Sequence, residues 1–270
     1  MKQKLKEKIK SLPQLPNSII ELEEFRKLKT SDPLILIDII KKDPLLVANI
    51  LKVANSSMFG FRNSVDTLSR AITLLGVNFT VSIAFGSIVQ NTIKSNLAPY
   101  RVSLDEFMRL CALSSTIVDE WIGKKDFDLK EELLMPAFLQ ETGKFIVSII
   151  LDQENKKDDF KNEINRYKNL SELEEKYVGF STPKITSYIF KHWSLGQNII
   201  YPIGYVQDLE NCPKNFLKKA QILDVVKTLV DIRNPLNDEA IQIALQKAQE
   251  YKLDKKRLEV ITSELKKEFH

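Results

Sequence analysis

Hydrophobic residues recur at intervals of three and four along most of this chain, which is the spacing of one buried helix face. Residues 43–76 show the pattern clearly. Asp43 can cap a helix, and Pro44 suits its first position because the ring fixes φ where the N–H needs no partner. Apolar residues follow on one face at Leu46, Ile50, Val53 and Ala54. The pattern predicts a helix that ends at the polar run 55–57, an ordered turn, and a second short helix closed by Gly76.

The same periodicity continues to the end of the chain, whereas the alternation typical of strands is almost absent. The chain has only 8 glycines among 270 residues, so few positions interrupt the pattern. The predicted fold class is therefore all-α, a multi-helical bundle. We predict helices at about 4–11, 18–30, 33–41, 44–54, 68–75, 77–95, 104–124, 130–152, 182–193, 197–208, 214–232, 238–250 and 255–268.

Two stretches break the helical pattern. Residues 95–103, which include Pro99, form a connection, and residues 152–172 are so polar that we expect a solvated loop or a surface helix. A Gly/Ser-rich linker that could separate two domains is not evident, so residues 1–270 are expected to form one helical unit. Its last part, 231–270, is an amphipathic helical extension that packs on the core or on a second copy of the chain as a homodimer.

Composition excludes several classes of protein. The net charge is only +4, from 40 basic and 36 acidic residues, and zinc-finger spacing and Gly-rich phosphate loops are absent, so nucleic acid is not the expected partner. The longest apolar run, 145–151, is too short to span a bilayer, and the charged N-terminus lacks a secretory apolar region. Two distant cysteines, Cys111 and Cys212, predict reduced thiols in a cytoplasmic protein.

Several motifs in a fixed order resemble one family. The chain opens with LPQLP at 12–16, continues through the helix at 18–30, and then reads DPLLVANILKVANSSMFG from Asp43, up to about Gly86. These motifs resemble the HDOD family, the HD-related output domains of bacterial signalling proteins. Weaker similarity covers 107–112, 137–143, 179–193 and 223–224, so the resemblance spans about 12–230 and is strongest over 12–86.

The resemblance connects the chain with metal-dependent HD phosphohydrolases, in which histidines and aspartates hold metal ions that activate water. A site of that kind needs several histidines that converge from different helices. This chain has two, His192 and His270, and His270 is the last residue. We therefore expect no metal and no cofactor, and His192 is interpreted as a histidine in the last turn of a helix.

Placing the family pattern on the sequence identifies the positions where ligands would stand. The first histidine falls at Leu110, and the His-Asp pair falls at Gln140 and Glu141. A later histidine falls near Thr182, and a His-His pair near Val206-Gln207. One position keeps its expected residue type: Asp224 stands where the superfamily often has an acid. These degenerate HD-site positions are Leu110, Gln140, Glu141, Thr182 and Asp224.

Two interpretations of Gln140 and Glu141 stay open. They could line a remnant ligand pocket, or they could be a polar pair satisfied by backbone groups or by Lys144. An atypical carboxylate site formed by Glu141, Asp224 and either Asp119 or Glu120 is a further alternative.

The loop that follows the helix at 44–54 is a candidate interaction loop, formed by Asn55, Ser56, Met58, Phe59 and Phe61. Its three large apolar side chains either pack inward or form an exposed patch, and exposed patches usually mark contacts with a partner.

The sequence thus predicts a non-catalytic regulatory or signalling protein that acts by binding another signalling protein, or a cyclic dinucleotide held in the remnant pocket. The alternative is a metal-dependent phosphohydrolase or cyclic-dinucleotide phosphodiesterase that uses the atypical carboxylate site.

Overall fold

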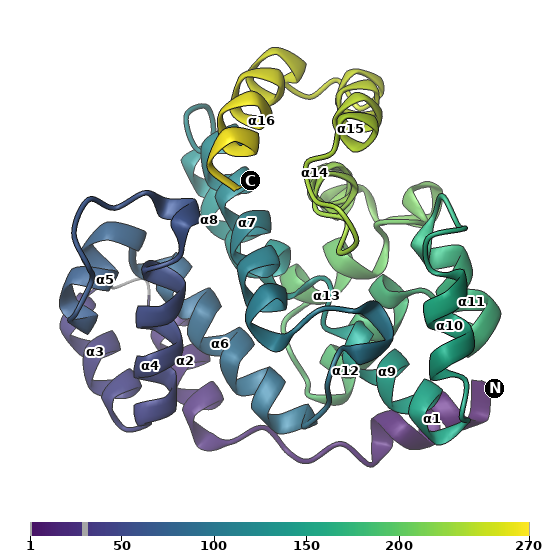
Figure 1. Ribbon diagram of the computed structural model, residues 1–270. Coiled ribbons are helices and arrows are strands. Elements are labelled where there is room, and N and C mark those ends of the chain that lie inside the picture. The colour runs from purple at the N-terminus through teal and green to yellow at the C-terminus, as the bar shows by residue number, and fades with distance from the viewer. Residues whose placement is uncertain (1, 29–31, 270) are drawn as a thin grey trace.

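The computed structural model describes residues 2–28 and 32–269, and within these ranges it contains helices and no strand (Figure 1). The predicted all-α class is therefore confirmed. The last two residues of the helix predicted at 18–30 lie outside the described residues, and so does His270. One continuous set of buried apolar side chains extends from Leu5 to Leu265 and joins the N-terminal, central and C-terminal helices in one core.

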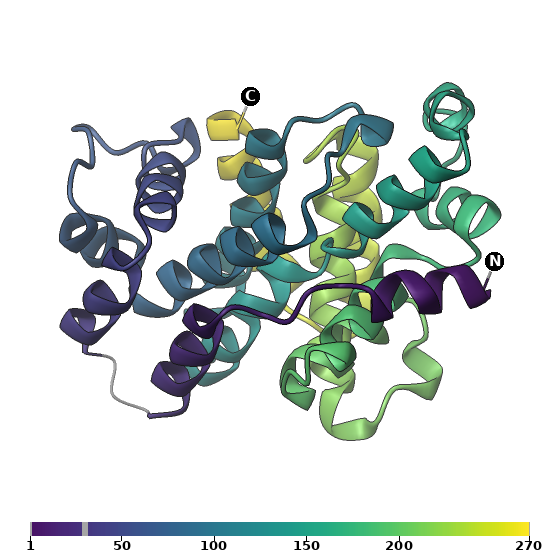
Figure 2. The same cartoon turned by 90° about the horizontal axis from the view of Figure 1, so that it is seen from below.

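The N-terminal helices form one side of the molecule and begin with matching caps. The elements are α1 (Lys2–Lys10), α2 (Asn17–Lys27), α3 (Pro33–Lys41), α4 (Pro44–Ala54), the 3-10 turn η1 (Ser57–Phe59) and α5 (Leu68–Leu75). Asp32 and Asp43 each accept hydrogen bonds from backbone N–H groups at the start of α3 and α4, with proline next in the chain. Figure 2 shows the segment between α1 and α2 crossing beneath the central helices.

The central helices supply most of the core. They are α6 (Val77–Ile93), the 3-10 turn η2 (Ala98–Tyr100), α7 (Leu104–Ile122), α8 (Phe127–Leu139) and α9 (Gly143–Gln153). Gly76 has a φ of +83°, and the helix axis bends by 117° between α5 and α6 at this residue. That left-handed backbone favours glycine because it has no Cβ to clash with the chain.

The prediction of one helix over 130–152 is wrong, because residues 140–142 form a turn between α8 and α9. Both helices are buried on almost every face, so the apolar pattern runs through the turn without a break. The turn brings Gly143 against α12: a Cβ on Gly143 would lie 2.5 Å from the carbonyl oxygen of Thr182. Only glycine permits this approach, and its N–H donates to Thr186 Oγ1 at 2.8 Å.

The polar segment at 152–172 contains the short surface helix α10 (Lys157–Glu163). A further helix, α11 (Leu170–Val178), begins at the end of this segment. The sequence analysis did not predict α11. Its apolar stripe is short and interrupted by acidic residues, although Asn169 caps its first turn by accepting the N–H of Ser171.

The chain ends with α12 (Thr182–His192), α13 (Gln197–Gly204), the 3-10 turn η3 (Leu209–Asn211), α14 (Lys214–Leu229), α15 (Asp238–Glu250) and α16 (Lys255–Phe269). The C-terminal extension docks within the same chain: α16 packs on α7 and on η1 (Figure 1). Two interactions fix the start of α16, since Trp121 Nε1 donates to the carbonyl of Asp254 and Arg257 pairs with Glu120 at 2.9 Å.

Within the described ranges, 127–153 is the one helical stretch long and apolar enough to cross a membrane when α8 and α9 are taken together. The bent pair of α5 and α6 passes the same test only if it is counted as one span. Within 127–153, 89% of the apolar 18-residue stretch is buried inside the protein, as in a helix that belongs to a protein core.

The contact between α6 and α8 at Gly86 gives a test of the packing. A Cβ on Gly86 would lie 2.4 Å from Cε1 of the buried Phe138 ring. Gly86→Val should therefore lower the free energy of unfolding by about 2–3 kcal/mol through overpacking. Gly196→Ala is the control, because no atom lies within 4 Å of the added methyl. Urea denaturation of both variants checks this, and equal stabilities would contradict the packing of α6 on α8.

Candidate functional site

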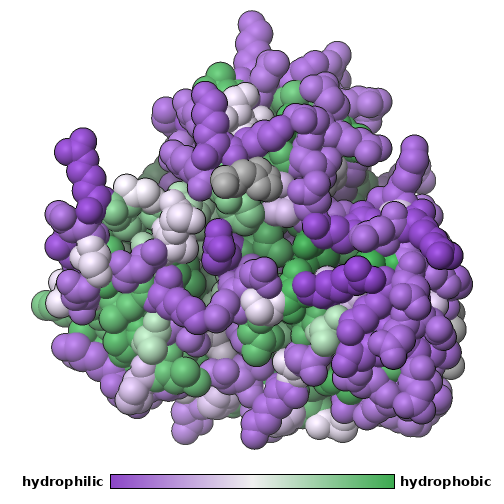
Figure 3. All heavy atoms as spheres, viewed as in Figure 1, coloured by the Kyte–Doolittle hydropathy of each residue, from purple (hydrophilic) through white to green (hydrophobic). Residues whose placement is uncertain are grey.

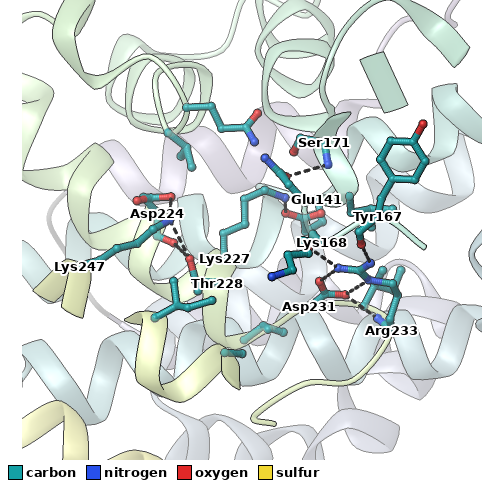
Figure 4. Close-up of a pocket in the computed structure, with 18 of the residues that line it drawn as sticks. Glu141, Tyr167, Lys168, Ser171, Asp224, Lys227, Thr228, Asp231, Arg233 and Lys247 are labelled. Atoms are coloured by element: carbon teal, nitrogen blue, oxygen red, sulfur yellow. Dashed lines mark hydrogen bonds and ion pairs between the residues drawn. The ribbon is translucent and has the colours of Figure 1, made fainter. Parts of the chain in front are cut away.

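An open cavity of about 940 Å³ lies between the α8–α9 turn, α14 and α15 (Figure 4). Its wall also includes the segment 165–171, which runs into the first turn of α11, and the segment 206–210, which follows α13. The floor carries charged side chains from α9 and α14. This is the size of a pocket for a small-molecule ligand, which is usually about 300–1,000 Å³.

Glu141 stands at the floor of the cavity because the α8–α9 turn projects it there. Its two carboxylate oxygens are engaged by different lysines: Oε1 lies 2.6 Å from Lys227 Nζ of α14, and Oε2 lies 2.9 Å from Lys144 Nζ of α9. Figure 4 shows Lys227 reaching from α14 to Glu141. The carboxylate therefore has a cation on each of its oxygens.

Lys144 continues this network into the core. Its side chain is only 2% exposed and pairs at 2.8 Å with Glu174 of α11, which is fully buried. Glu174 also accepts hydrogen bonds from the Tyr100 hydroxyl at 3.0 Å and from the backbone N–H of Thr182 at 2.7 Å. The ammonium group lies 4.7 Å from the centre of the Tyr100 ring. The α8–α9 turn, α11 and η2 thus meet at the buried ammonium group, and α12 joins the network through Glu174.

The charges of this network perturb one another. Burial alone would raise the pKa of Glu141, but Lys144 and Lys227 outweigh burial and lower it from 4.5 to about 2. Burial alone would lower the pKa of Lys144, but Glu141 and Glu174 outweigh burial and raise it above its usual value. Burial, followed by the charge of Glu174, raises the pKa of Tyr100 well above 10.0. Glu141 is therefore ionised and Lys144 is charged at neutral pH.

A second paired acid, Asp224, lines the cavity from α14. Its Oδ1 binds Lys247 of α15 at 2.8 Å, and its Oδ2 accepts the hydroxyl of Tyr251, the residue after α15, at 2.8 Å. Asp231 pairs with Arg233 at 2.5 Å, and Arg233 donates to the carbonyls of three residues of the 164–168 segment. Arg233 lies in the segment between α14 and α15, and its hydrogen bonds hold the 164–168 segment against it at the rim of the cavity (Figure 4).

The fold brings several of the degenerate positions together. Glu141, Asp224 and the Val206-Gln207 pair all line the 940 Å³ cavity. Leu110 lies with Glu141 on a neighbouring cavity of about 10 Å³. Thr182 connects to the same network through its N–H on Glu174, but it does not line the large cavity.

Gln140, like Thr182, does not line the 940 Å³ cavity. It is only 1% exposed, and among the described residues neither its Oε1 nor its Nε2 has a hydrogen-bond partner. Its backbone carbonyl accepts the hydroxyl of Thr186 at 3.0 Å.

The two additional acids of the atypical carboxylate site lie elsewhere. Asp119 pairs with Lys130, and Glu120 pairs with Arg257 of α16, and neither lines the cavity that contains Glu141 and Asp224. Across 2–28 and 32–269, the structure holds no group of three His, Cys, Asp or Glu side chains suited to a metal ion. His192 is the last residue of α12, as its sequence position suggested.

The candidate interaction loop is folded onto the core. Met58 is buried, and Phe59 stacks on Phe61 at 5.6 Å and meets Phe79 edge to face. The Asn55 side chain holds the loop closed, since its Nδ2 donates to the carbonyl of Val65 and its Oδ1 accepts the N–H of Val65. Ser56 lies on a separate cavity between α4 and α7.

Sequence reasoning found Lys144 as a partner of Glu141 and missed the other charged residues that pair with Glu141, Lys144 and Asp224. Lys144 was among the expected partners because it stands three residues further along the chain. Lys227, Lys247 and Glu174 come from distant helices, and their sequence context is that of ordinary surface charges. For α14, the sequence offered one indication of a charged site: Asp224 and Lys227 stand three residues apart and so lie on one helix face.

The comparisons with known proteins identify the class of this chain. The model of the HDOD domain matches residues 12–209. The chain therefore belongs to the HDOD family, as its sequence motifs suggested, although the match ends before Asp224. A search of the curated proteins finds no match.

Solved structures support the fold. A virulence factor from Campylobacter jejuni subsp. jejuni has 25% identity and a TM-score of 0.58, covering 95% of this chain and 94% of that chain. An HDOD domain protein of unknown function from Geobacter sulfurreducens has 16% identity and a TM-score of 0.65, covering 94% and 89%. A protein provisionally assigned to signal transduction, from Marinobacter aquaeolei VT8, has 16% identity and a TM-score of 0.71, covering 96% and 57%.

Removing the buried cation tests the network. Lys144→Met leaves Glu174 buried without its counter-charge, which should lower the free energy of unfolding by about 3–5 kcal/mol. Lys42→Met is the matched control, since Lys42 pairs with Glu21 at the surface, and its loss should cost less than about 1 kcal/mol. Adding Glu174→Gln to Lys144→Met should restore part of the loss, because the amide still accepts hydrogen bonds without a charge. Chemical denaturation measures all three, and equal effects of the two lysine variants would contradict the network.

The pKa of Glu141 predicts how stability depends on pH. Folding lowers this pKa from 4.5 to about 2, so the stabilisation is complete above 4.5 and disappears as the pH falls towards 2. The difference in free energy of unfolding between wild type and Glu141→Gln should therefore be largest near neutral pH and shrink across that window. Urea denaturation at a series of pH values measures it, with the exposed Glu264→Gln as control. A difference that stays constant from neutral pH down to 2 would contradict the assignment.

Proposed function

We propose that this HDOD protein is a non-catalytic regulatory component of a cytoplasmic signalling pathway, and that it acts by binding. One observation carries the proposal: both oxygens of Glu141, at the position of the HD pair, are engaged by lysine ammonium groups. A metal cation that approached Glu141 would meet the positive charge of both lysines, which already neutralise the carboxylate.

The second acid of the cavity is also engaged. Asp224 is bound by Lys247 and by the Tyr251 hydroxyl, so its oxygens too have partners from the protein. The chemistry of this donor set is that of a closed charge network, because each carboxylate is balanced by an ammonium group from another part of the fold. The chain keeps an HD-type fold but has paired lysines and carboxylates where the hydrolases hold metal ions, and this combination supports a binding role.

The surface of the N-terminal helices supports a protein partner. Among the described residues, nine large apolar side chains are exposed, and six of them belong to the stretch 20–74: Ile20, Leu28, Leu34, Ile35, Leu45 and Leu74. Figure 3 shows apolar surface gathered over this side of the molecule. Apolar groups that remain exposed on a soluble protein favour contact with another protein over contact with nucleic acid.

The 940 Å³ cavity favours a second, compatible role, which is to bind a cyclic dinucleotide or a related nucleotide. Lys227 and Lys247 line it from α14 and α15. Each ammonium group has three donors, and Lys227 uses one on Glu141 while Lys247 uses two, on Asp224 and the Thr228 hydroxyl. A fluorescent cyclic dinucleotide should then bind with an affinity that falls at least about tenfold in Lys247→Gln, since a hydrogen bond to a charged group contributes about 1.5–3 kcal/mol.

Metal content and hydrolysis test the principal proposal. The purified chain should contain far less than one Mn, Fe, Ni or Zn per molecule by elemental analysis. It should hydrolyse bis(p-nitrophenyl) phosphate and cyclic dinucleotides no faster than Glu141→Ala and Asp224→Ala. Circular dichroism establishes that both variants are folded, and Asp224→Asn serves as the conservative form. Near-stoichiometric metal that is lost in the variants, together with hydrolysis that depends on it, would overturn the non-catalytic assignment and favour a phosphodiesterase.

A further inference from the structure

A second cavity, of about 170 Å³, lies between α4, the start of η1 and the first turns of α7. It is separate from the 940 Å³ cavity, and the two share no lining residue. Val53 and Met108 form apolar parts of its wall. The other lining side chains are polar or charged, so the cavity combines a shaped wall with hydrogen-bond donors.

Two of these donors lack partners. The Nε of Arg109 and the hydroxyl of Ser56 are both shielded from solvent, and neither has a hydrogen-bond partner within the described part of the chain. Both residues line the cavity. A shielded polar group without a partner is costly to the fold, and such groups usually meet a bound molecule or an ion. Here they come from two elements and border the same space.

The charge balance of the cavity is positive. Lys52 and Arg109 contribute two cations, and Asp105 contributes the one carboxylate, which pairs with Lys52 at 2.5 Å. The neighbouring Glu106 is occupied by the backbone N–H and the hydroxyl of Ser103, both at 2.7 Å. Among the carboxylates of residues 2–28 and 32–269, none forms an ion pair with Arg109, although the charge of Arg109 helps to lower the pKa of Glu106, three residues away. The Cζ of Arg109 lies 5.3 Å from the centre of the Phe269 ring at the end of α16, and this contact orients the guanidinium.

We propose that this cavity is a binding site for a phosphate group, with Arg109, Ser56 and Lys52 as its donors. A guanidinium, a hydroxyl and an ammonium that converge from different elements match the several oxygens of a phosphate, and Arg is well suited to such recognition. The cavity volume accommodates a phosphate with part of an attached ester group. Asp105 keeps Lys52 in place before phosphate binds. Since α4, α7 and α16 meet here, an occupied site would hold the N-terminal helices, the central helices and the C-terminal extension together.

The test is titration of the full chain with two probes in a chloride buffer, followed by calorimetry and ³¹P NMR. Inorganic phosphate represents the free ion, and O-phosphoserine represents a phosphorylated side chain. At least one should bind saturably to the wild type, and the tighter of the two identifies the source of the phosphate. Arg109→Gln should weaken that binding at least about tenfold, because it removes hydrogen bonds to a charged group.

Two further variants make the result independent of folding. Ser56→Ala should weaken phosphate binding about threefold or more without lowering the thermal midpoint of the phosphate-free protein, because the hydroxyl has no partner to lose. Arg70→Gln removes an exposed arginine outside the cavity and should leave binding unchanged. Failure of both probes to bind the wild type would overturn the proposal, and so would equal binding by wild type, Ser56→Ala and Arg109→Gln.

Discussion

The burial of the Lys144 ammonium is the constraint on which the centre of this molecule depends. A charge with 2% of its side chain exposed is stable only where counter-charges and hydrogen bonds replace water, and here Glu141 and Glu174 supply them. Glu174 in turn needs the Tyr100 hydroxyl and the N–H of Thr182. The requirement therefore fixes the relative positions of η2, α9, α11, α12 and the α8–α9 turn.

The same constraint explains the character of the large cavity. Related hydrolases place metal ions beside the HD position, and in this chain the positive charge beside Glu141 is covalently attached, on Lys144 and Lys227. A lysine on a helix provides charge and hydrogen-bond donors, but it offers no open coordination position for water or a phosphate ester. The proposed binding role uses this charged floor as a surface that recognises a ligand.

Helix α7 lies beside two smaller cavities. Leu110 lies with Glu141 on the cavity of about 10 Å³, while the adjacent Arg109 lines the cavity at α4 and η1. The C-terminal helix packs on α7 and η1, and its Phe269 ring lies beside Arg109. Successive residues of one helix thus border the proposed phosphate site and the small cavity beside Glu141, whereas the 940 Å³ cavity has no lining residue from α7.

The sequence alone determined the helical class, the caps at Asp32 and Asp43, the family and the scarcity of histidine ligands, because these depend on local patterns and on composition. It also indicated Lys144 as a partner of Glu141, since three residues along the chain is a local interval. Only the tertiary structure decided that Glu174, Lys227 and Lys247 complete the charge network, that 130–152 divides at a turn, and that Ser56 and Arg109 border one cavity. These features depend on contacts between helices far apart in the sequence, and neither periodicity nor spacing along one chain specifies such contacts.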